Sequence, residues 1–167
     1  VAELIGKGWK IGVVAQSHSV VEQFMDKVKE KNVLIPMAKK PQFDSTKSYH
    51  RDAIDGWAMG QPGGYLVGGT AWSFCSSKFK SLDLDLIVVD EAGQFSLANT
   101  LAVISTGKNA LLLGDPQQLP QVSQGSHPDP VEVASLAHLL NGRATIPSTL
   151  GYFLSESYRM HSLVTEP

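Results

Sequence analysis

Two adjacent carboxylates close an apolar run near the middle of the sequence, and their spacing suits metal and proton chemistry. Residues 84–89 are almost entirely apolar, and Asp90 and Glu91 follow them directly. Consecutive residues past a strand end point in different directions, so one carboxylate can hold a hydrated Mg²⁺ while the other orients an attacking water. A strand followed by the acidic N-terminus of a helix gives the same pattern, because the helix dipole favours carboxylates there. This pair alone does not separate the two interpretations.

A second apolar run, residues 110–113, ends in Gly114 and Asp115, with Gln118 three positions later. A glutamine amide can donate to a phosphate oxygen or to an attacking water without adding charge, which suits a sensor of a terminal phosphate. Taken alone, this pattern is better explained as a turn bracketed by prolines. Two polar strand ends in one sheet favour a shared nucleotide pocket instead.

Tyr158 and Arg159 form a third candidate near the end of the sequence. The guanidinium group is permanently charged and fork-shaped, so it can stabilise charge on a phosphoryl group in transfer. A neighbouring tyrosine can stack on a base. An exposed arginine on a surface helix is the default interpretation, and only the position of the pair after the other two motifs adds weight.

The elements that would position these residues alternate between strand and helix. Strands are predicted over 11–15, 65–67, 84–89 and 110–113, and helices over 1–5, 17–31 and 94–104. Residues 32–64 lack periodicity and predict a surface insertion, with at most a short helix near 49–53. The alternation predicts a parallel α/β sheet with apolar strands covered on both faces, in which ligands gather at the carboxyl ends of the strands.

Composition limits the classes of protein to consider. The 167 residues carry 43% hydrophobic side chains and a net charge of −2, which predicts one compact domain without a global basic field. The single cysteine, Cys75, excludes an internal disulfide framework and suits a reducing, cytoplasmic setting. No apolar run approaches the length of a membrane span, and the N-terminus lacks the pattern of a secretion signal.

Taken in order, these residues resemble the motor core of superfamily 1 helicases. The resemblance corresponds to motifs Ia, Ic, II, III and IV of that family and rests on Ser17-His18, Gly69-Thr70, Asp90-Glu91-Ala92-Gly93-Gln94, Gly114-Asp115-Pro116-Gln117-Gln118-Leu119 and Tyr158-Arg159-Met160-His161. The last three motifs in this order are specific, whereas the first two would mean little alone. The sequence is most similar to the branch that includes the RNA-surveillance helicase and the replication nuclease-helicases. Residues 8–10 and 16–21 also resemble the helicase part of bacterial proteins fused to a RecB-like nuclease.

The resemblance implies a nucleotide site that binds ATP and Mg²⁺. In the family pattern, Asp90 would hold magnesium through water, and Glu91 would be the general base. Gln118 would sense the γ-phosphate, beside Gly114 and Asp115.

Other residues would connect this site to its surroundings. Gln94 would help couple nucleotide state to the cleft between two motor domains. Arg159 would be an arginine finger and Tyr158 an adenine-stacking group, both presented by the second motor domain.

The resemblance also implies a track for single-stranded DNA or RNA. Ser17, His18 and Thr70, at strand ends, would contact its phosphate backbone. Uncharged contacts of this kind position a strand without reading its sequence.

The implied fold is a RecA-like P-loop NTPase, three-layer α/β/α with a mostly parallel sheet. Residues 1–148 would form part of a first RecA-like domain with 32–64 as an insertion, and 149–167 a linker and the start of a second domain. The family's glycine-rich loop ending in Gly-Lys-Ser/Thr occurs nowhere in the sequence, and Gly6-Lys7-Gly8 lacks its spacing. We therefore expect a piece of a longer helicase, with weak or no ATP binding and no ATPase activity of its own.

The missing loop implies a missing strand. In this family the strand before the loop lies beside the strand that ends at Gly114, so its loss would expose that edge. An open apolar edge invites pairing with another chain. We expect self-association through it, or its occlusion by residues 125–167.

Two other hypotheses remain open. One is a non-catalytic nucleic-acid or protein-binding module that keeps the motor fold, and a glycine-rich loop encoded upstream of Val1 would argue against it. The other, a P-loop ATPase without helicase action, is disfavoured by residues 158–161.

Overall fold

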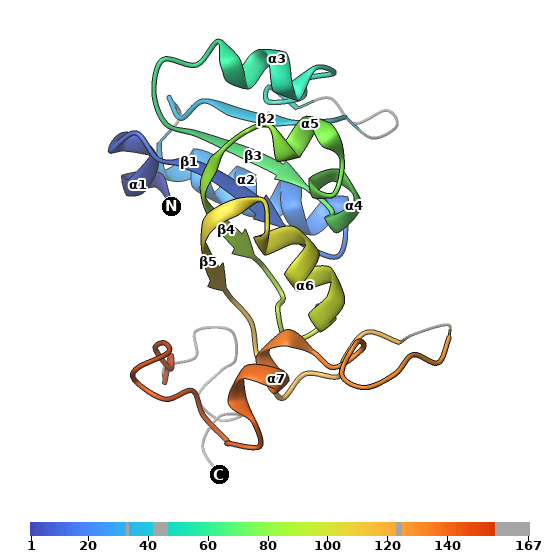
Figure 1. The fold of residues 1–167 in the computed structure, drawn as a ribbon. Helices are drawn as coiled ribbons and strands as arrows, with labels where there is room; N and C mark the ends of the chain where they lie inside the picture. The colour runs from blue at the N-terminus through green and yellow to red at the C-terminus, as the bar shows by residue number, and fades with distance from the viewer. Residues whose placement is uncertain (33, 42–46, 123–124, 156–167) are drawn as a thin grey trace.

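A five-stranded, wholly parallel sheet forms the centre of the computed structural model (Figure 1), which describes residues 1–155 except 33, 42–46 and 123–124. The strand order is β2-β3-β1-β4-β5. The strands are β1 Lys10–Val14, β2 Met37–Lys39, β3 Tyr65–Gly69, β4 Leu84–Val89 and β5 Gly107–Leu112. The predicted α/β class with a parallel sheet is confirmed.

Helices cover both faces of this sheet. They are α1 Ala2–Gly6, α2 His18–Lys31, α3 Ile54–Met59, α4 Ala71–Phe74, α5 Ser77–Lys80, α6 Leu97–Ile104 and α7 Ser135–Leu140. Residues of α1 and α2 pack into one hydrophobic core, and residues of α3 to α7 pack into the core on the opposite face (Figure 1). The architecture is therefore three-layer α/β/α.

The side chains of β4 show why the central strands read as continuous apolar runs. Ile87 and Val89 belong to one core, whereas Leu86 and Val88 belong to the other. Because successive side chains of a strand point to opposite faces, a strand buried on both faces is apolar at nearly every position, and Asp85 near the start of β4 is the exception here. Each buried aliphatic side chain contributes about 1.5–3 kcal/mol.

Serine caps set where two of the helices begin. Ser17 accepts a hydrogen bond from the Val20 amide (3.3 Å) and begins α2 close to its predicted start. Ser96 accepts one from the Asn99 amide (3.3 Å), so α6 begins at Leu97 and not at the predicted residue 94. A side-chain cap satisfies a backbone amide that the first helical turn leaves unpaired.

Residues 32–64 contribute a strand to the sheet, which corrects their interpretation as a surface insertion without one. β2 pairs in parallel with β3, and its three residues are all buried. The helix of this segment lies at 54–59, not near 49–53. A three-residue strand is too short to show a periodic pattern, so its burial depends on neighbours that only the tertiary structure supplies.

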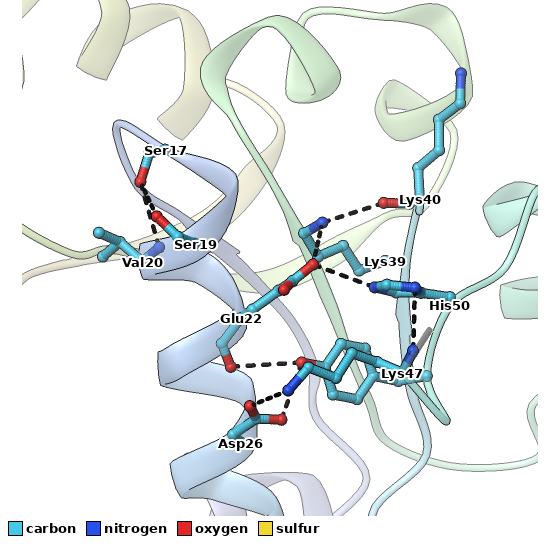
Figure 2. A network of polar contacts seen from close by, with 10 residues as sticks. Ser17, Ser19, Val20, Glu22, Asp26, Lys39, Lys40, Lys47 and His50 are labelled. Atoms are coloured by element: carbon cyan, nitrogen blue, oxygen red, sulfur yellow. Dashed lines mark hydrogen bonds and ion pairs between the residues drawn. The ribbon is translucent and has the colours of Figure 1, made fainter. Parts of the chain in front are cut away.

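A polar network fastens this segment to α2 (Figure 2). The Lys39 side chain is only 1% exposed and donates to Glu22 Oε1 at 2.9 Å. His50 Nε2 lies 3.2 Å from the same carboxylate oxygen. A buried charge is tolerated when it is paired and hydrogen-bonded, as Lys39 is here.

Asp26, one turn further along α2, holds the next part of the segment. Its carboxylate accepts hydrogen bonds from Lys47 Nζ (2.9 Å) and from the Tyr49 hydroxyl (3.0 Å). Burial disfavours the charge on Asp26, but the bonds from Lys47 and Tyr49 outweigh it and lower the pKa. Tyr49 is 3% exposed, so the aromatic ring anchors the segment as well.

The opposite edge of the sheet is open. Among the described residues β5 pairs only with β4, and residues 108–111 are exposed. The expectation that the strand ending near Gly114 has an exposed edge is thus confirmed. The expectation that this strand is covered on both faces is wrong, because Leu111 is 42% exposed.

Among the described helices, none is long and apolar enough to cross a membrane.

Candidate functional site

The ends of β4 and β5 dock against each other at the carboxyl edge of the sheet. Val89 and Leu112 are register partners, and the Leu113 amide donates to the Val89 carbonyl at 2.9 Å. Past the strand end, the Ala92 amide donates to the Leu113 carbonyl at 2.7 Å. The two polar segments singled out in the sequence therefore meet, as predicted from parallel strands.

Glycine makes this contact possible. A Cβ atom at Gly93 would lie 2.0 Å from the Asp115 carbonyl oxygen, a distance that no side chain could occupy. Gly114 has φ +155°, and a Cβ there would lie 2.8 Å from the Ala92 amide nitrogen. Glycine adopts such a conformation readily and permits close backbone approach. Both glycines thus serve the docking of the two loops.

The side chains of Gln94 and Gln118 join across this contact. Gln94 Nε2 donates to Gln118 Oε1 at 2.9 Å, and the Gln118 amide donates to the Asp115 carbonyl at 3.3 Å. With its amide oxygen engaged by Gln94, Gln118 keeps its NH₂ group as a donor. This orientation leaves the group able to donate to an anionic oxygen.

Asp90 lies directly at the end of β4 and is half-buried. Its amide donates to the Val14 carbonyl (2.8 Å), which extends the pairing with β1, and its Oδ1 accepts from the Glu91 amide (3.1 Å). Burial raises the pKa of the Asp90 carboxyl above its ordinary value, although the bond from Glu91 opposes the shift. Desolvation disfavours a charged carboxylate, and a bound cation would offset that cost.

Glu91 adopts a backbone conformation that is uncommon outside glycine. Its φ is +57°, in the left-handed region. Such conformations cost of order 1–3 kcal/mol and cluster at functional sites. α6 begins only at Leu97, so neither carboxylate lies at a helix N-terminus, and the helix-dipole explanation of Asp90-Glu91 is excluded.

These residues fit a magnesium ion of the kind that is held mainly by water and phosphate. Among the described residues, no group of three or more His, Cys, Asp or Glu side chains is gathered as a metal site. Mg²⁺ commonly keeps several waters and takes only one or two carboxylates, together with substrate phosphates. Asp90 could supply one such carboxylate, with water and nucleotide phosphates as the other ligands.

Asp115 and Gly114 have structural tasks in this arrangement. Asp115 Oδ1 accepts from the Gln117 amide at 2.9 Å, which closes a tight side-chain turn. This bond engages one oxygen of an exposed carboxylate, and the backbone of both residues shapes the loop that carries Gln118.

Three residues were predicted to contact single-stranded nucleic acid: Ser17, His18 and Thr70. They follow the ends of the neighbouring β-strands β1 and β3. Val14 of β1 is the register partner of Gly69 of β3, so Ser17 and Thr70 follow adjacent strand ends. Ser17 caps α2, and Thr70 Oγ1 lies 3.5 Å from Ser73 Oγ. Their hydroxyl groups are thus held in place by local contacts.

His18 is the first residue of α2. Its Nδ1 is buried and has no hydrogen-bond partner among the described residues. Burial, reinforced by the charge of Lys39, lowers its pKa. The ring is therefore neutral near pH 7 and is not a charged contact for a phosphate.

Two residues of the site were missed in the sequence. Gln16 Nε2 donates to the Gln94 carbonyl at 3.1 Å and so connects the loop after β1 to the loop after β4. Ser135 Oγ donates to the Ala92 carbonyl at 2.9 Å. A polar residue at the end of a predicted strand could have identified Gln16, whereas nothing in the sequence connects Ser135 with a loop 43 positions away. Tyr158 and Arg159 lie outside the described residues.

The fold and site define a parallel α/β protein whose carboxyl edge combines an acidic loop, a glutamine pair and hydroxyl groups. Residues 65–124 match the family described as AAA domain, a match that covers less than half of the chain. It includes β3, β4, β5 and the loops that hold Asp90 and Gln118. A search of curated proteins found no match.

Two solved structures are similar to this chain. One is a complex of arterivirus nonstructural protein 10, a helicase, with DNA, at 16% identity and a TM-score of 0.49, and it matches 76% of this chain and 28% of the helicase. The other is a crystal structure of the arterivirus helicase, at 16% identity and a TM-score of 0.48, covering 76% of this chain and 27% of that one. The chain thus spans little more than a quarter of the length of these helicases.

Proposed function

We propose that this chain is part of an ATP-dependent helicase motor and carries the residues that handle magnesium, water and the terminal phosphate. The observation that supports this most strongly is the docking of the loops after β4 and β5, closed by the 2.9 Å bond between Gln94 and Gln118. The docking packs the loop that carries Asp90 and Glu91 against the loop that carries Gln118, at the carboxyl edge where ligands bind in parallel α/β sheets.

Each residue then has a distinct task. Asp90 holds magnesium, which when bound neutralises charge on the phosphates of ATP. Glu91 takes the proton of the attacking water, and Gln118 donates to an oxygen of the terminal phosphate. The left-handed backbone at Glu91 (φ +57°) supports this assignment, because such conformations cluster at functional sites.

The nucleic-acid track lies at the ends of β1 and β3. Ser17 and Thr70 offer hydroxyl groups to the backbone of a single strand, with His18 as a neutral neighbour. The bond from Gln16 to the Gln94 carbonyl connects this track with the nucleotide pocket. A shift of Gln118 on loss of the terminal phosphate would reach the track through Gln94 and Gln16.

The remaining parts of the motor are supplied by a longer protein. Residues 1–148 belong to its first RecA-like domain and 149–167 lead into the second, which presents Arg159 and Tyr158. The glycine-rich phosphate loop lies elsewhere in that protein. If the resemblance to RecB-like nuclease fusions holds, so does a nuclease domain. This chain alone is then inactive as an ATPase.

A non-catalytic binding module with the same fold is the alternative. The observation in its favour is that no Gly-Lys-Ser/Thr loop occurs in these 167 residues. Backbone amides and the lysine of such a loop supply most phosphate binding.

A measurement of ATP hydrolysis by the longer protein distinguishes a helicase motor from a non-catalytic binding module. We expect Asp90→Asn to lower nucleic-acid-stimulated turnover by about 100-fold or more while single-strand binding is kept. Asp83→Asn is the matched control, because Asp83 is an exposed carboxylate at the other end of β4. Unchanged turnover in the Asp90 variant would rule out its assigned role.

A further inference from the structure

The carboxyl ends of β2, β3 and β1 lie side by side. Besides Ser17, His18 and Thr70, two further residues near these ends could contact a nucleic acid. Lys39 of β2 is the register partner of Gly68 of β3, and Gly69 is the partner of Val14 of β1. Adjacent strands are about 4.8 Å apart. Lys40, Thr70 and Ser17 therefore follow three neighbouring strand ends within about 10 Å.

Trp72 projects into solvent beside Thr70. It belongs to α4, where Phe74 is fully buried and Ala71 packs against the same core. These two residues face inward and fix the short helix, so the Trp72 ring faces outward and is 88% exposed. The other two tryptophans, Trp9 and Trp57, are partly buried and pack against the cores.

Lys40 supplies a cation on the same edge. Its carbonyl accepts from the buried Lys39 ammonium at 3.2 Å, which ties the backbone of Lys40 to the network around Glu22. Figure 2 shows the Lys40 side chain pointing away from that network. In the described part of the chain, Lys40 Nζ has no ion pair.

We infer, on the basis of the proposed function, that Lys40 and Trp72 extend the nucleic-acid track, with Trp72 stacking on a base and Lys40 contacting a phosphate. Proteins that bind single strands without sequence preference combine cationic contacts with aromatic stacking. A chain with a net charge of −2 has little general attraction for a polyanion, so a local cation and a stacking platform would have to supply the affinity. The shared chemistry is an unpaired base next to a phosphate, in DNA or RNA.

Binding of fluorescein-labelled oligo(dT) and oligo(U) to this chain, measured by anisotropy, tests the tryptophan. We expect Trp72→Ala to weaken binding at least about fivefold and Trp72→Phe to weaken it less. Tyr152→Ala is the control, because Tyr152 is 94% exposed and belongs to the segment after α7, not to one of these strand ends. Unlabelled oligo(dT) should also quench the tryptophan fluorescence of the wild-type chain, and Trp72→Phe should abolish that quenching.

The salt dependence of binding tests the lysine. Removal of one phosphate contact should make the slope of log K against log salt shallower by about 0.7 for a single strand, so we expect this change in Lys40→Gln. Lys31→Gln should leave the slope unaltered, since Lys31 is exposed at the other end of α2.

The outcomes separate this inference from the proposed function. Oligonucleotide binding that is unaffected by Trp72→Ala and Lys40→Gln would overturn the extended track and leave the proposed function intact. An absence of binding by the wild-type chain at about 1 mM would overturn the track, and ATP turnover in the longer protein would still decide the function. Trp72 and Lys40 are both exposed, so neither substitution should alter the circular-dichroism melting curve.

Discussion

The two edge strands of the sheet differ in burial: β2 is covered by other parts of the chain, and β5 is exposed. The β2 edge is short, buried and fastened to α2 by Lys39, Asp26 and Tyr49. The β5 edge is twice as long and is exposed over residues 108–111. Natural proteins usually cover, charge or shorten an edge strand, because unpaired backbone groups recruit other strands. The β2 edge meets that requirement within the chain, whereas no described residue pairs with the free side of β5, which predicts that this edge takes a partner.

The largest effect should come from breaking the buried ion pair of the β2 edge. Lys39→Met leaves Glu22 without its ammonium partner, which should lower the free energy of unfolding by about 3 kcal/mol. Urea unfolding measures this, and Lys40→Met at the exposed neighbouring position should change it by less than about 0.5 kcal/mol. Equal stability of the two variants would show that the pair does not hold this edge.

A charge placed on the β5 edge should reduce self-association. We expect the wild-type chain to associate with rising concentration, and Leu111→Lys to weaken that association about tenfold, or 1.4 kcal/mol. Sedimentation velocity measures the change, with Leu34→Lys, 88% exposed elsewhere, as the control. A wild-type chain that remains monomeric at high concentration contradicts the prediction.

Loss of one hydroxyl group at the β2 edge should have a smaller effect. Tyr49→Phe removes the donor to Asp26 but keeps the buried ring, so we expect about 1 kcal/mol of destabilisation. Tyr152→Phe, at an exposed position, should leave the urea midpoint unchanged. A neutral result for Tyr49→Phe would mean that water replaces the hydroxyl at no cost.

The smallest expected effect is a change in the pH dependence of stability when Asp90 is replaced. It should distinguish the site after β4 from the β2 edge. Burial raises the pKa of Asp90, so its contribution to stability is present below the unfolded-state pKa and is lost as pH rises through the folded-state pKa. Asp90→Asn should therefore stabilise the metal-free chain slightly at pH 7 and not at pH 3. Urea midpoints at the two pH values measure this.

The carboxylates of the β2 edge should behave in the opposite sense. Burial disfavours their charged form, but their partners prevail and lower the pKa values of Glu22 and Asp26, so their contribution is present at neutral pH and is lost on acidification. Stabilisation of Asp90→Asn at both pH values would contradict the assignment of the effect to the Asp90 charge.

Strands that are buried on both faces could be predicted from the sequence, because that burial requires a run of apolar residues. The strand whose burial depends on tertiary contacts, β2, could not. Apart from Lys10 and Asp85, the strands β1, β3 and β4 are continuous apolar runs, so their existence and parallel arrangement could be predicted. β2 is three residues long and contains Lys39, whose burial depends on a partner 17 positions away. No local pattern reveals such a pair.

The candidate site was predictable to a similar degree. Asp90, Glu91 and Gln118 follow strand ends, and parallel strands bring their carboxyl ends together by geometry alone. The bond between Gln94 and Gln118, the left-handed Glu91 and the contact from Gln16 depend on how two loops pack, which spacing does not determine. The roles of Tyr158 and Arg159 stay predictions.

Single-turnover ATP hydrolysis by the longer protein carrying Glu91→Gln tests the central claim most directly, with Glu3→Gln at an exposed position of α1 as the control. If the loops after β4 and β5 surround one terminal phosphate, hydrolysis should fall about 100-fold or more while ATP affinity changes less than about twofold. Hydrolysis at the wild-type rate would contradict the claim, because a general base in that pocket cannot be removed without slowing the reaction.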